Sequence, residues 1–348
     1  MAGDVLKLTS LKGTAMQCGE AYGRIFEPLI MGFCQQGVRP DKKKLSYARK
    51  CWRHVEQCAP VSARFMRGVS AGSHLPLEHI TLLTLHEEVA HMAHCTAFVA
   101  CGAATRGGRT VNAMNWDWSP SLYVWPGLLR LQVKGTPAAL TCHYPGLWAA
   151  AGINDAGLSL MWTSSGGGPK SRPRVGLPTY VLIAEVLRRR TVEEAVDYIR
   201  RTKRAGPFNL LLGDASGGTA VVEGMPGYLS IERSGDAMVR ANHYVCEDMV
   251  RRAGQKLSRR PTPSTVARYR QMVQLVRRQY SKITAAVARK MLTNRRGSWP
   301  WIHQFPGGPA AQALGAMTID SLIAVSQDRV LHTCRGGRTP GPWQAFSL

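Results

Sequence analysis

Cys95 is the residue whose type and setting most readily support covalent chemistry. It opens a β-type run, and the pair Gly107-Gly108 turns the chain back into a second run that reaches Asp117. In an antiparallel hairpin centred near Arg106, the outer ends of the two runs lie together. The pattern therefore predicts that the thiol of Cys95 lies close to the carboxylate of Asp117. A thiolate attacks amide and thioester carbonyls, and neighbouring groups set how much thiolate is present.

Four short motifs extend this chemistry along the chain. They are His94-Cys95-Thr96, Asn115-Trp116-Asp117, the segment 152–158 that includes Asn154, and Ala241-Asn242-His243. In these motifs and their order the chain resembles the acyl-coenzyme A:6-aminopenicillanic acid acyltransferase family of self-cleaving N-terminal-nucleophile hydrolases. More distantly, it resembles penicillin V acylases and bile-salt hydrolases. The motifs span much of residues 95–325, and the helical region before Cys95 fits the leader segment of the family.

The resemblance implies a role for each matching residue. In this family the precursor cuts the bond before the cysteine, here His94-Cys95, so that one residue carries a thiol and a free α-amine. Such an amine titrates near ~8 and can move the proton of the thiol. The resemblance further implies that Asp117 orients this amine and that Asn242 stabilises the oxyanion, and that no metal or redox cofactor is needed.

The expected substrate is a small molecule: an N-acyl amine, an N-acyl amino acid or an acyl thioester such as acyl-coenzyme A. It would react through an acyl-Cys95 intermediate. Trp162 and Thr163 match positions that face the substrate in related folds, and Asn115 is a third candidate for substrate binding. Hydrolysis is favoured over acyl transfer, because transfer requires that water be excluded and a second substrate recruited.

Two departures from the family pattern bear on this interpretation. His94 stands where the family has glycine, which predicts slow processing, and Leu314 stands where it has arginine. Arg335 cannot be assigned to that missing role from sequence. Two alternatives therefore stay open: a basic binding protein that kept the fold but lost catalysis, and a papain-type cysteine enzyme with His243 as a separate base.

Composition bounds the class of protein. The chain has 348 residues, 45% of them apolar, and no apolar run approaches the ~18 residues of a membrane span. Its start lacks the apolar core of a signal peptide, so a cytoplasmic location is the default. The nine cysteines contain no Cys-x-x-Cys pair, which favours reduced thiols over a zinc site or a disulfide framework.

The formal net charge of +23 raises the question of nucleic-acid binding. The basic residues, however, are spread through many segments, and no nucleic-acid module or set of stacking aromatics accompanies them. We therefore expect no specific nucleic-acid partner, although attraction of anionic substrates such as coenzyme A phosphates is possible.

A histidine-rich stretch before Cys95 resembles a metal-binding helix. His86 and His91 are five residues apart, whereas the zincin pattern requires four. Glu87, His91 and His94 do share a helical face. A polar helix that leads to the cleavage point, with Glu87 or His91 assisting cleavage, is the simpler interpretation, and no metal is expected.

Hydrophobic periodicity and turn residues predict the order of elements. Helices are expected at 19–36, 43–58, 77–92, 180–190, 191–201, 264–280 and 282–292. Strands are expected at 96–101, 110–115, 128–133, 138–142, 158–163, 209–212, 219–223, 228–233, 237–242, 317–325 and 329–334. Periodicity supports only a mixed α+β domain, and the family resemblance implies a four-layer αββα sandwich.

The resemblance also implies how the chain is divided. Residues 1–94 would form a helical leader that becomes a small chain after self-cleavage, and residues 95–348 would form the catalytic chain. The two would stay associated as one structural domain, and a homo-oligomer is possible.

Overall fold

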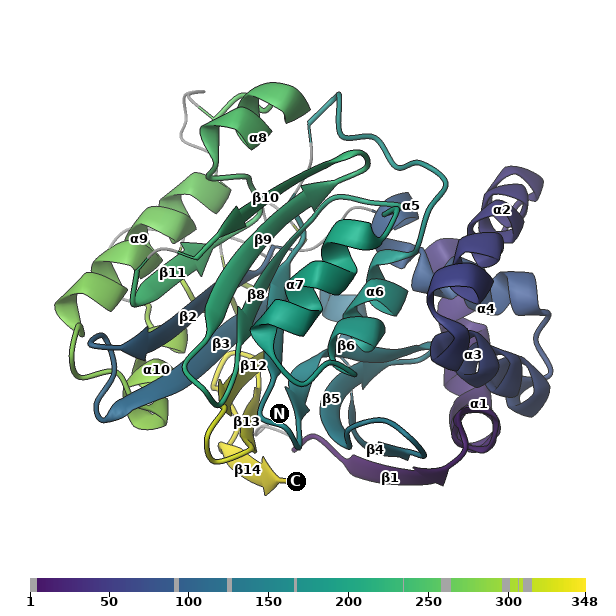
Figure 1. The fold of residues 1–348 in the computed structure, drawn as a ribbon, viewed down its shortest axis with the longest axis horizontal. Helices are drawn as coiled ribbons and strands as arrows, with labels where there is room; N and C mark the ends of the chain where they lie inside the picture. The colour runs from purple at the N-terminus through teal and green to yellow at the C-terminus, as the bar shows by residue number, and fades with distance from the viewer. Residues whose placement is uncertain are drawn as a thin grey trace.

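Two β-sheets lie face to face, and helices cover the outer face of each (Figure 1). The computed structural model describes residues 5–90, 94–123, 127–165, 168–233, 235–257, 264–295, 301–305, 307–308 and 315–348. The four layers follow the order helix, sheet, sheet, helix, so the α+β class and the αββα sandwich are confirmed.

The larger sheet has eight strands and holds most of the middle of the chain. In spatial order they are β1 (Leu8–Gly13), β4 (Gly127–Val133), β5 (Ala139–Tyr144), β6 (Leu147–Asn154), β7 (Ser159–Thr163), β8 (Phe208–Gly213), β9 (Thr219–Met225) and β10 (Tyr228–Glu232). The β1–β4 pair is parallel, and the other neighbours in this sheet are antiparallel.

The smaller sheet has six strands, all paired antiparallel. In spatial order they are β11 (Ala237–Arg240), β2 (Thr96–Gly102), β3 (Gly108–Trp118), β12 (Met317–Val325), β13 (Val330–Arg335) and β14 (Gln344–Ser347). The inner faces of β2 and β3 pack against β7 and β8 of the larger sheet. The central core therefore lies between the sheets, beside the strand that Cys95 precedes.

Helices that precede β8 in the chain cover the larger sheet. They are α1 (Ala15–Phe33), α2 (Lys42–Cys58), α3 (Pro60–Ser73), α4 (Leu77–Thr84), α5 (His86–Ala90), α6 (Thr179–Val186) and α7 (Val192–Arg201). A π-helical turn (Cys34–Val38) follows α1, and a 3₁₀ turn (Pro120–Leu122) follows β3. Helix α6 packs on β6 and α7 on β9. The elements before Cys95 join this layer directly, because β1 pairs with β4, and because α3, α4 and α5 contact α6.

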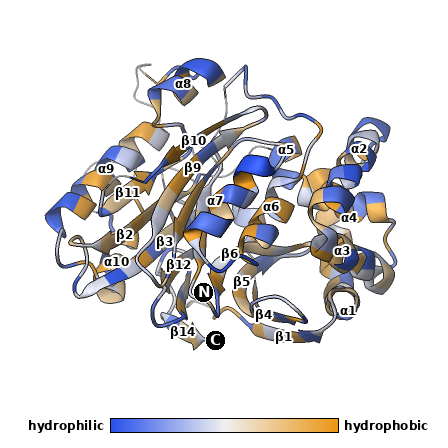
Figure 2. Ribbon diagram, in the orientation of Figure 1, coloured by the Kyte–Doolittle hydropathy of each residue, from blue (hydrophilic) through white to orange (hydrophobic). Residues whose placement is uncertain are grey.

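Three later helices lie toward the other side of the molecule: α8 (Glu247–Ala253), α9 (Ser264–Arg278) and α10 (Ala285–Leu292). Helix α9 packs on β11 and β2, whereas α10 packs on β12 and β3. Hydrophilic residues colour much of α2, α7 and α8 in Figure 2, and hydrophobic residues follow the strands. This distribution is expected for helices with one face on a sheet and one in water.

Sequence periodicity found most elements but missed several. Helix α3 and strands β1, β6 and β14 were not predicted, and neither was α8. The predicted helix 77–92 is divided at Leu85 into α4 and α5, and residues 91–93 of that prediction lie outside the described part of the chain. Nevertheless, the predicted strands 96–101, 110–115 and 317–325 all lie within observed strands.

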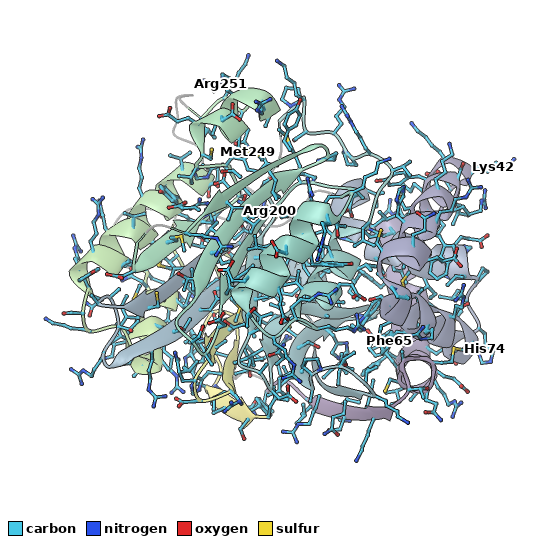
Figure 3. All side chains as sticks on the ribbon, in the orientation of Figure 1. Lys42, Phe65, His74, Arg200, Met249 and Arg251 are labelled. Carbon is cyan, nitrogen blue, oxygen red and sulfur yellow. The ribbon has the colours of Figure 1, made fainter. Side chains whose placement is uncertain are left out.

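The positive charge is dispersed. Lys42, Arg200 and Arg251, labelled in Figure 3, project from α2, α7 and α8 in different parts of the molecule. Many of these cations pair with nearby acids, as Arg251 does with Asp248 at 2.9 Å. The three labelled cations therefore lie apart from one another and do not form one patch.

Three further features of the described residues concern membranes, thiols and metals. None of their helices is both long and apolar enough to cross a bilayer. All nine cysteines lie in the described segments as unpaired thiols. These segments also contain no group of three or more His, Cys, Asp or Glu side chains arranged to hold a metal ion.

Candidate active site

The β2–β3 hairpin brings Cys95 and Asp117 together, as its turn glycines predict. Thr96 pairs with Asn115, and the backbone N–H of His94 donates to the carbonyl of Asp117 at 2.9 Å. The register is thus one residue from the predicted one, with Asp117 opposite His94 instead of Cys95. The backbone N–H of Asp117 lies near the Cys95 sulfur and lowers the pKa of the thiol. The contact between the two ends of the hairpin is confirmed.

Asp117 is a buried carboxyl with one bonded oxygen. Thr318 donates its hydroxyl to Oδ1 at 2.7 Å, and Oδ2 has no hydrogen-bond partner among the described residues. Burial raises the pKa of Asp117 to about 7, although the charge of Arg268 and the bond from Thr318 oppose the rise. Near neutral pH the group can therefore hold or release a proton, with one oxygen free for a new donor.

Asn242 follows β11, and its backbone is fixed on both sides. The amide of Asn209 donates to the carbonyls of Ala241 (3.0 Å) and His243 (3.1 Å), the residues that flank it. The Asn242 backbone N–H donates to Thr265 Oγ1 at 2.7 Å. Its side-chain Nδ2 donates to the carbonyl and hydroxyl oxygens of Ser164, each at 3.0 Å. Both N–H groups of this amide are therefore engaged by Ser164, and an oxyanion would have to replace one of these acceptors.

A buried arginine of α9 joins these groups. Arg268 is 1% exposed, and its Nη1 donates to the carbonyl of Cys95 at 2.5 Å and to Thr96 Oγ1 at 2.6 Å. Its Nη2 donates to Asn242 Oδ1 at 2.9 Å. The sequence did not predict this role: Arg268 lies 26 positions from Asn242 in a helix with many basic residues, and no local pattern distinguishes it from them.

The thiol of Cys95 is buried and is therefore neutral near pH 7. Burial is the main cause of its raised pKa, and the negative charges of Asp117 and Glu87 add to it. The N–H of Asp117 and the charge of Arg268 act in the opposite direction. The pKa of His94 is lowered to about 4 by burial and by Arg268, so its imidazole is also neutral.

Two acids of α5 lie beside this cluster. Glu87 and Glu88 of α5 are both buried. Burial, the neighbouring Glu88 and an opposing bond from Ser164 leave the pKa of Glu87 at about 8. Burial also raises the pKa of Glu88 to about 7, against bonds from Thr179. Because Ser164 contacts both Glu87 and Asn242, α5 is connected to the candidate oxyanion donor.

The three residues predicted to bind substrate have different surroundings. Trp162 is buried, and its ring makes edge contacts with Trp116 and Tyr180. Thr163 donates to the carbonyl of Ala241 at 2.6 Å, where it supports the segment that carries Asn242. Asn115 is directed toward the outer helices.

The amide of Asn115 is fully engaged there. Its Nδ2 donates to the carbonyls of Leu292 (2.8 Å) and Ile302 (3.0 Å), and its Oδ1 accepts from Ser321. The structure therefore gathers Cys95, Asp117 and Asn242, but it does not bring the amide of Asn115 to them.

Other residues singled out by sequence are engaged elsewhere. His243 is within hydrogen-bond distance of Thr265 (2.8 Å) and packs against Tyr269, and its pKa is lowered to about 4 by burial and nearby arginines. Arg335 pairs with Asp320 at 2.9 Å. His91 and Leu314 lie outside the described residues.

The motif around Asn154 forms a turn between β6 and β7. Asn154 Oδ1 accepts from the backbone N–H groups of Ala156 and Leu158, while Nδ2 donates to the carbonyls of Leu187 and Arg189. Gly157 has a φ of +87°, which favours glycine. These contacts support a structural role for the motif.

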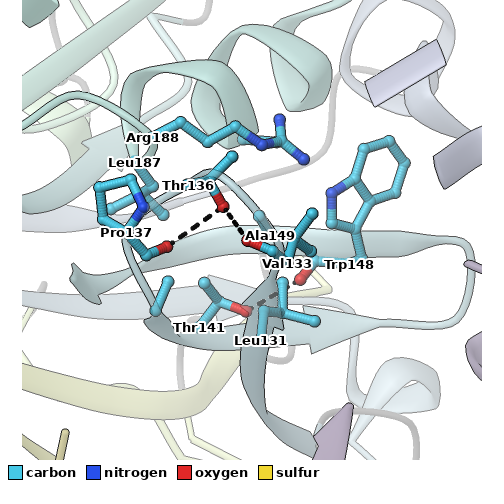
Figure 4. Close-up of a pocket in the computed structure, with 11 residues that line it drawn as sticks. Leu131, Val133, Thr136, Pro137, Thr141, Trp148, Ala149, Leu187 and Arg188 are labelled. Atoms are coloured by element: carbon cyan, nitrogen blue, oxygen red, sulfur yellow. Dashed lines mark hydrogen bonds between the residues drawn. The ribbon is translucent and has the colours of Figure 1, made fainter. Parts of the chain in front are cut away.

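A small cavity lies away from this cluster, between β4, β5 and β6 and the end of α6 (Figure 4). It encloses about 20 Å³ beneath Leu187 and Arg188, next to Trp148. None of Cys95, Asp117 and Asn242 lines it. The cavity has room for about one water molecule and is not a candidate for the substrate site.

The stacked sheets, the helices outside them and a cysteine just before an inner strand define the class as the N-terminal-nucleophile hydrolase fold. A variant of the conjugated bile acid hydrolase from Clostridium perfringens shares this fold, with a TM-score of 0.50 at 12% identity over 73% of this chain and 97% of that chain. A family model described as acyl-coenzyme A:6-aminopenicillanic acid acyl-transferase matches residues 104–306. The chain belongs to this family.

Two further solved structures are similar at slightly lower scores. Penicillin V acylase from Agrobacterium tumefaciens gives a TM-score of 0.49 at 17% identity, covering 73% of this chain and 86% of that one. The Caenorhabditis elegans ortholog of N-acylethanolamine-hydrolyzing acid amidase gives 0.47 at 15% identity, covering 67% and 93%. A search of curated proteins finds no match.

Proposed function

We propose that the protein is a self-processing cysteine amidohydrolase that acts on a small N-acyl amine or N-acyl amino acid through an acyl-Cys95 intermediate. One observation carries the proposal: Cys95, Asp117 and Asn242, from three separate segments, converge around a single buried arginine. A nucleophile, a carboxyl and a fixed amide donor are the groups that acyl transfer through a thiol requires.

Maturation would begin at the His94-Cys95 bond. The Cys95 sulfur attacks the carbonyl carbon of His94, the C–N bond breaks, and the acyl group passes to sulfur while the nitrogen takes up a proton. Water then hydrolyses the thioester, which leaves a carboxylate on His94 and a free amine and thiol on Cys95. Removal of the preceding peptide bond would also uncover the buried thiol.

In turnover the new amine takes the proton of the thiol, and the thiolate attacks the acyl carbonyl of the substrate. The tetrahedral oxyanion takes over one of the two N–H bonds that Asn242 Nδ2 makes to Ser164 in the structure. The C–N bond then breaks with proton transfer to the leaving amine. Water releases the acid from Cys95. The free oxygen of Asp117 would accept from the Cys95 amine, which accounts for an unbonded carboxyl oxygen at this position.

Intact-mass measurement of the purified protein tests the maturation step. We expect the wild-type chain to appear as two species that end at His94 and begin at Cys95, and the Cys95→Ala variant to remain one species. A wild-type preparation that stays whole while it turns over an N-acyl amine would contradict the proposed processing. A cut at another bond would contradict the assignment of the nucleophile.

A further inference from the structure

Arg268 is a buried cation that makes no direct ion pair with any described carboxylate. Its Nη groups bond the neutral oxygens of Cys95, Thr96 and Asn242. Asp117 and Cys95 are nevertheless close enough to interact with its charge. A buried charge without a close partner is destabilising, so its retention calls for a physical reason. Here it lies where a thiolate and then an oxyanion would form.

The contact with Asn242 fixes which end of the amide is the donor. The two ends of a carboxamide are nearly the same size, whereas a guanidinium only donates. Because Arg268 donates to Oδ1, that oxygen must face the arginine, and Nδ2 must face Ser164. Loss of the arginine would allow the amide to turn and present an oxygen where the oxyanion forms.

The contact with Cys95 fixes the backbone of the nucleophile. A newly cut chain end loses the restraint of the preceding residue and tends to fray. The carbonyl of Cys95 and the hydroxyl of Thr96 both accept from Nη1 of Arg268. One rigid side chain would therefore hold the new terminus and the candidate oxyanion donor at a constant separation.

We propose that Arg268 is a positioning residue that holds Cys95 and Asn242 at a fixed separation and favours the thiolate form of Cys95. This inference rests on the proposed function and extends it, because neither the hairpin nor the family motifs assign a cation from α9 to the site. A lysine could keep the charge, but its single ammonium lacks the planar fork that reaches three oxygens. Charge and geometry can therefore be tested separately.

The test uses full-length wild type, Arg268→Gln and Arg268→Lys, with Arg277→Gln as the matched control at an exposed position of the same helix. The probe is 4-nitrophenyl acetate: the Cys95 sulfur takes the acetyl group and 4-nitrophenolate leaves. The acetylation rate is followed at pH 7 by mass of the Cys95 peptide. The pH dependence of iodoacetamide labelling at the same peptide gives the apparent thiol pKa.

We expect Arg268→Gln to raise the apparent thiol pKa by about one unit or more and to slow acetylation at least about tenfold. Arg268→Lys should keep the thiol pKa within about half a unit and still acetylate about tenfold more slowly, because the fork is lost. The control should match wild type. If the arginine had only a structural role, Arg268→Lys would not slow acetylation while leaving the thiol pKa unchanged.

An Arg268→Lys variant that acetylates within twofold of wild type would overturn the proposal, and this holds even if Arg268→Gln does not fold. A folded Arg268→Gln variant with an unchanged thiol pKa would also overturn it. Failure of wild type itself to be cut or acetylated at Cys95 would instead contradict the proposed function, and with it the positioning role of Arg268.

Discussion

Asn242 is the residue whose role can be isolated most cleanly, because each end of its amide has a defined partner. Asn242→Asp keeps the oxygen that Arg268 holds at 2.9 Å and removes the N–H donor. We expect a folded variant in which acyl transfer from 4-nitrophenyl acetate falls on the order of 100-fold, since one oxyanion donor is lost. The single-turnover rate measures this. A rate within threefold of wild type would exclude Asn242 as the donor.

Glu87 makes the stability of the uncut chain depend on pH. Burial first, then Glu88, raises its pKa to about 8 from 4.5. The contribution of protonated Glu87 to the stability of the folded chain is therefore fully present below about pH 4.5 and is lost as pH rises through about 8. Relative to Glu87→Gln, we expect the melting temperature of the uncut Cys95→Ala chain to fall by a few °C, roughly, between pH 5 and 8.

The melting temperature of Cys95→Ala must be compared with that of its Glu87→Gln derivative, because other groups in the protein also titrate. The pKa values of three buried histidines, His94, His243 and His303, are each lowered to about 4. Because these histidines are neutral in the folded chain, their contribution to its stability decreases as pH falls. Their effect has the opposite sign below about pH 6.5. A difference between Cys95→Ala and its Glu87→Gln derivative that does not vary with pH would show that Glu87 is already ionised in the folded chain.

Among single residues, the sequence could identify the candidate reacting groups better than the residues that hold them in position. Cys95, Asp117 and Asn242 stand in short motifs whose residue types match the chemistry. Arg268 and Asn209 carry no such signal, because each acts through a contact with a residue distant in sequence. Their positions depend on the packing of α9 and β8, which local pattern does not encode.

Helices α1 and α3 illustrate a constraint at the level of elements. A Cβ added at Gly68 would lie 2.3 Å from the carbonyl oxygen of Met16, and one at Gly19 would lie 2.0 Å from that of Phe65. The two backbones are therefore nearly in contact. We expect Gly68→Ala to force the helices apart and to destabilise the chain by about 1–3 kcal/mol.

Chemical denaturation of the uncut Cys95→Ala chain measures this effect. Arg64→Ala is the matched control, since Arg64 is exposed on the same helix. A stability of Gly68→Ala equal to that of the control would contradict the close approach of α1 and α3.

The elements that sequence predicted well are those with strong local signals. The Gly107-Gly108 turn, where both φ angles are positive, fixed the β2–β3 hairpin to within one residue of register. Strand β6 was missed because its Ala-Ala-Ala-Gly stretch has low β propensity, and tertiary pairing with β5 and β7 overrides it. Helix α3 was missed because its glycines, which close packing against α1 requires, have low helix propensity and weaken the helical pattern.

For the whole molecule, the position of the leader predicts that the two chains stay together after cleavage. Strand β1 forms a parallel pair with β4 along Leu8 to Gly13, and α1 packs on α3 and on β1. We expect the two chains to co-elute in native size-exclusion chromatography and to separate only in denaturant. Loss of the chain that ends at His94 from the native particle after cleavage would contradict a single two-chain structural unit.

The proposed chemistry depends on the sulfur of Cys95 as the carrier of the acyl group. Peptide-level mass spectrometry after exposure to a panel of N-acyl amines detects that group at its site. We expect an acyl adduct on a peptide that begins at Cys95 in wild type, and neither an adduct nor a cut in Cys95→Ala. Turnover of an N-acyl amine by Cys95→Ala, or an acyl group found on another of the nine cysteines, would refute this role.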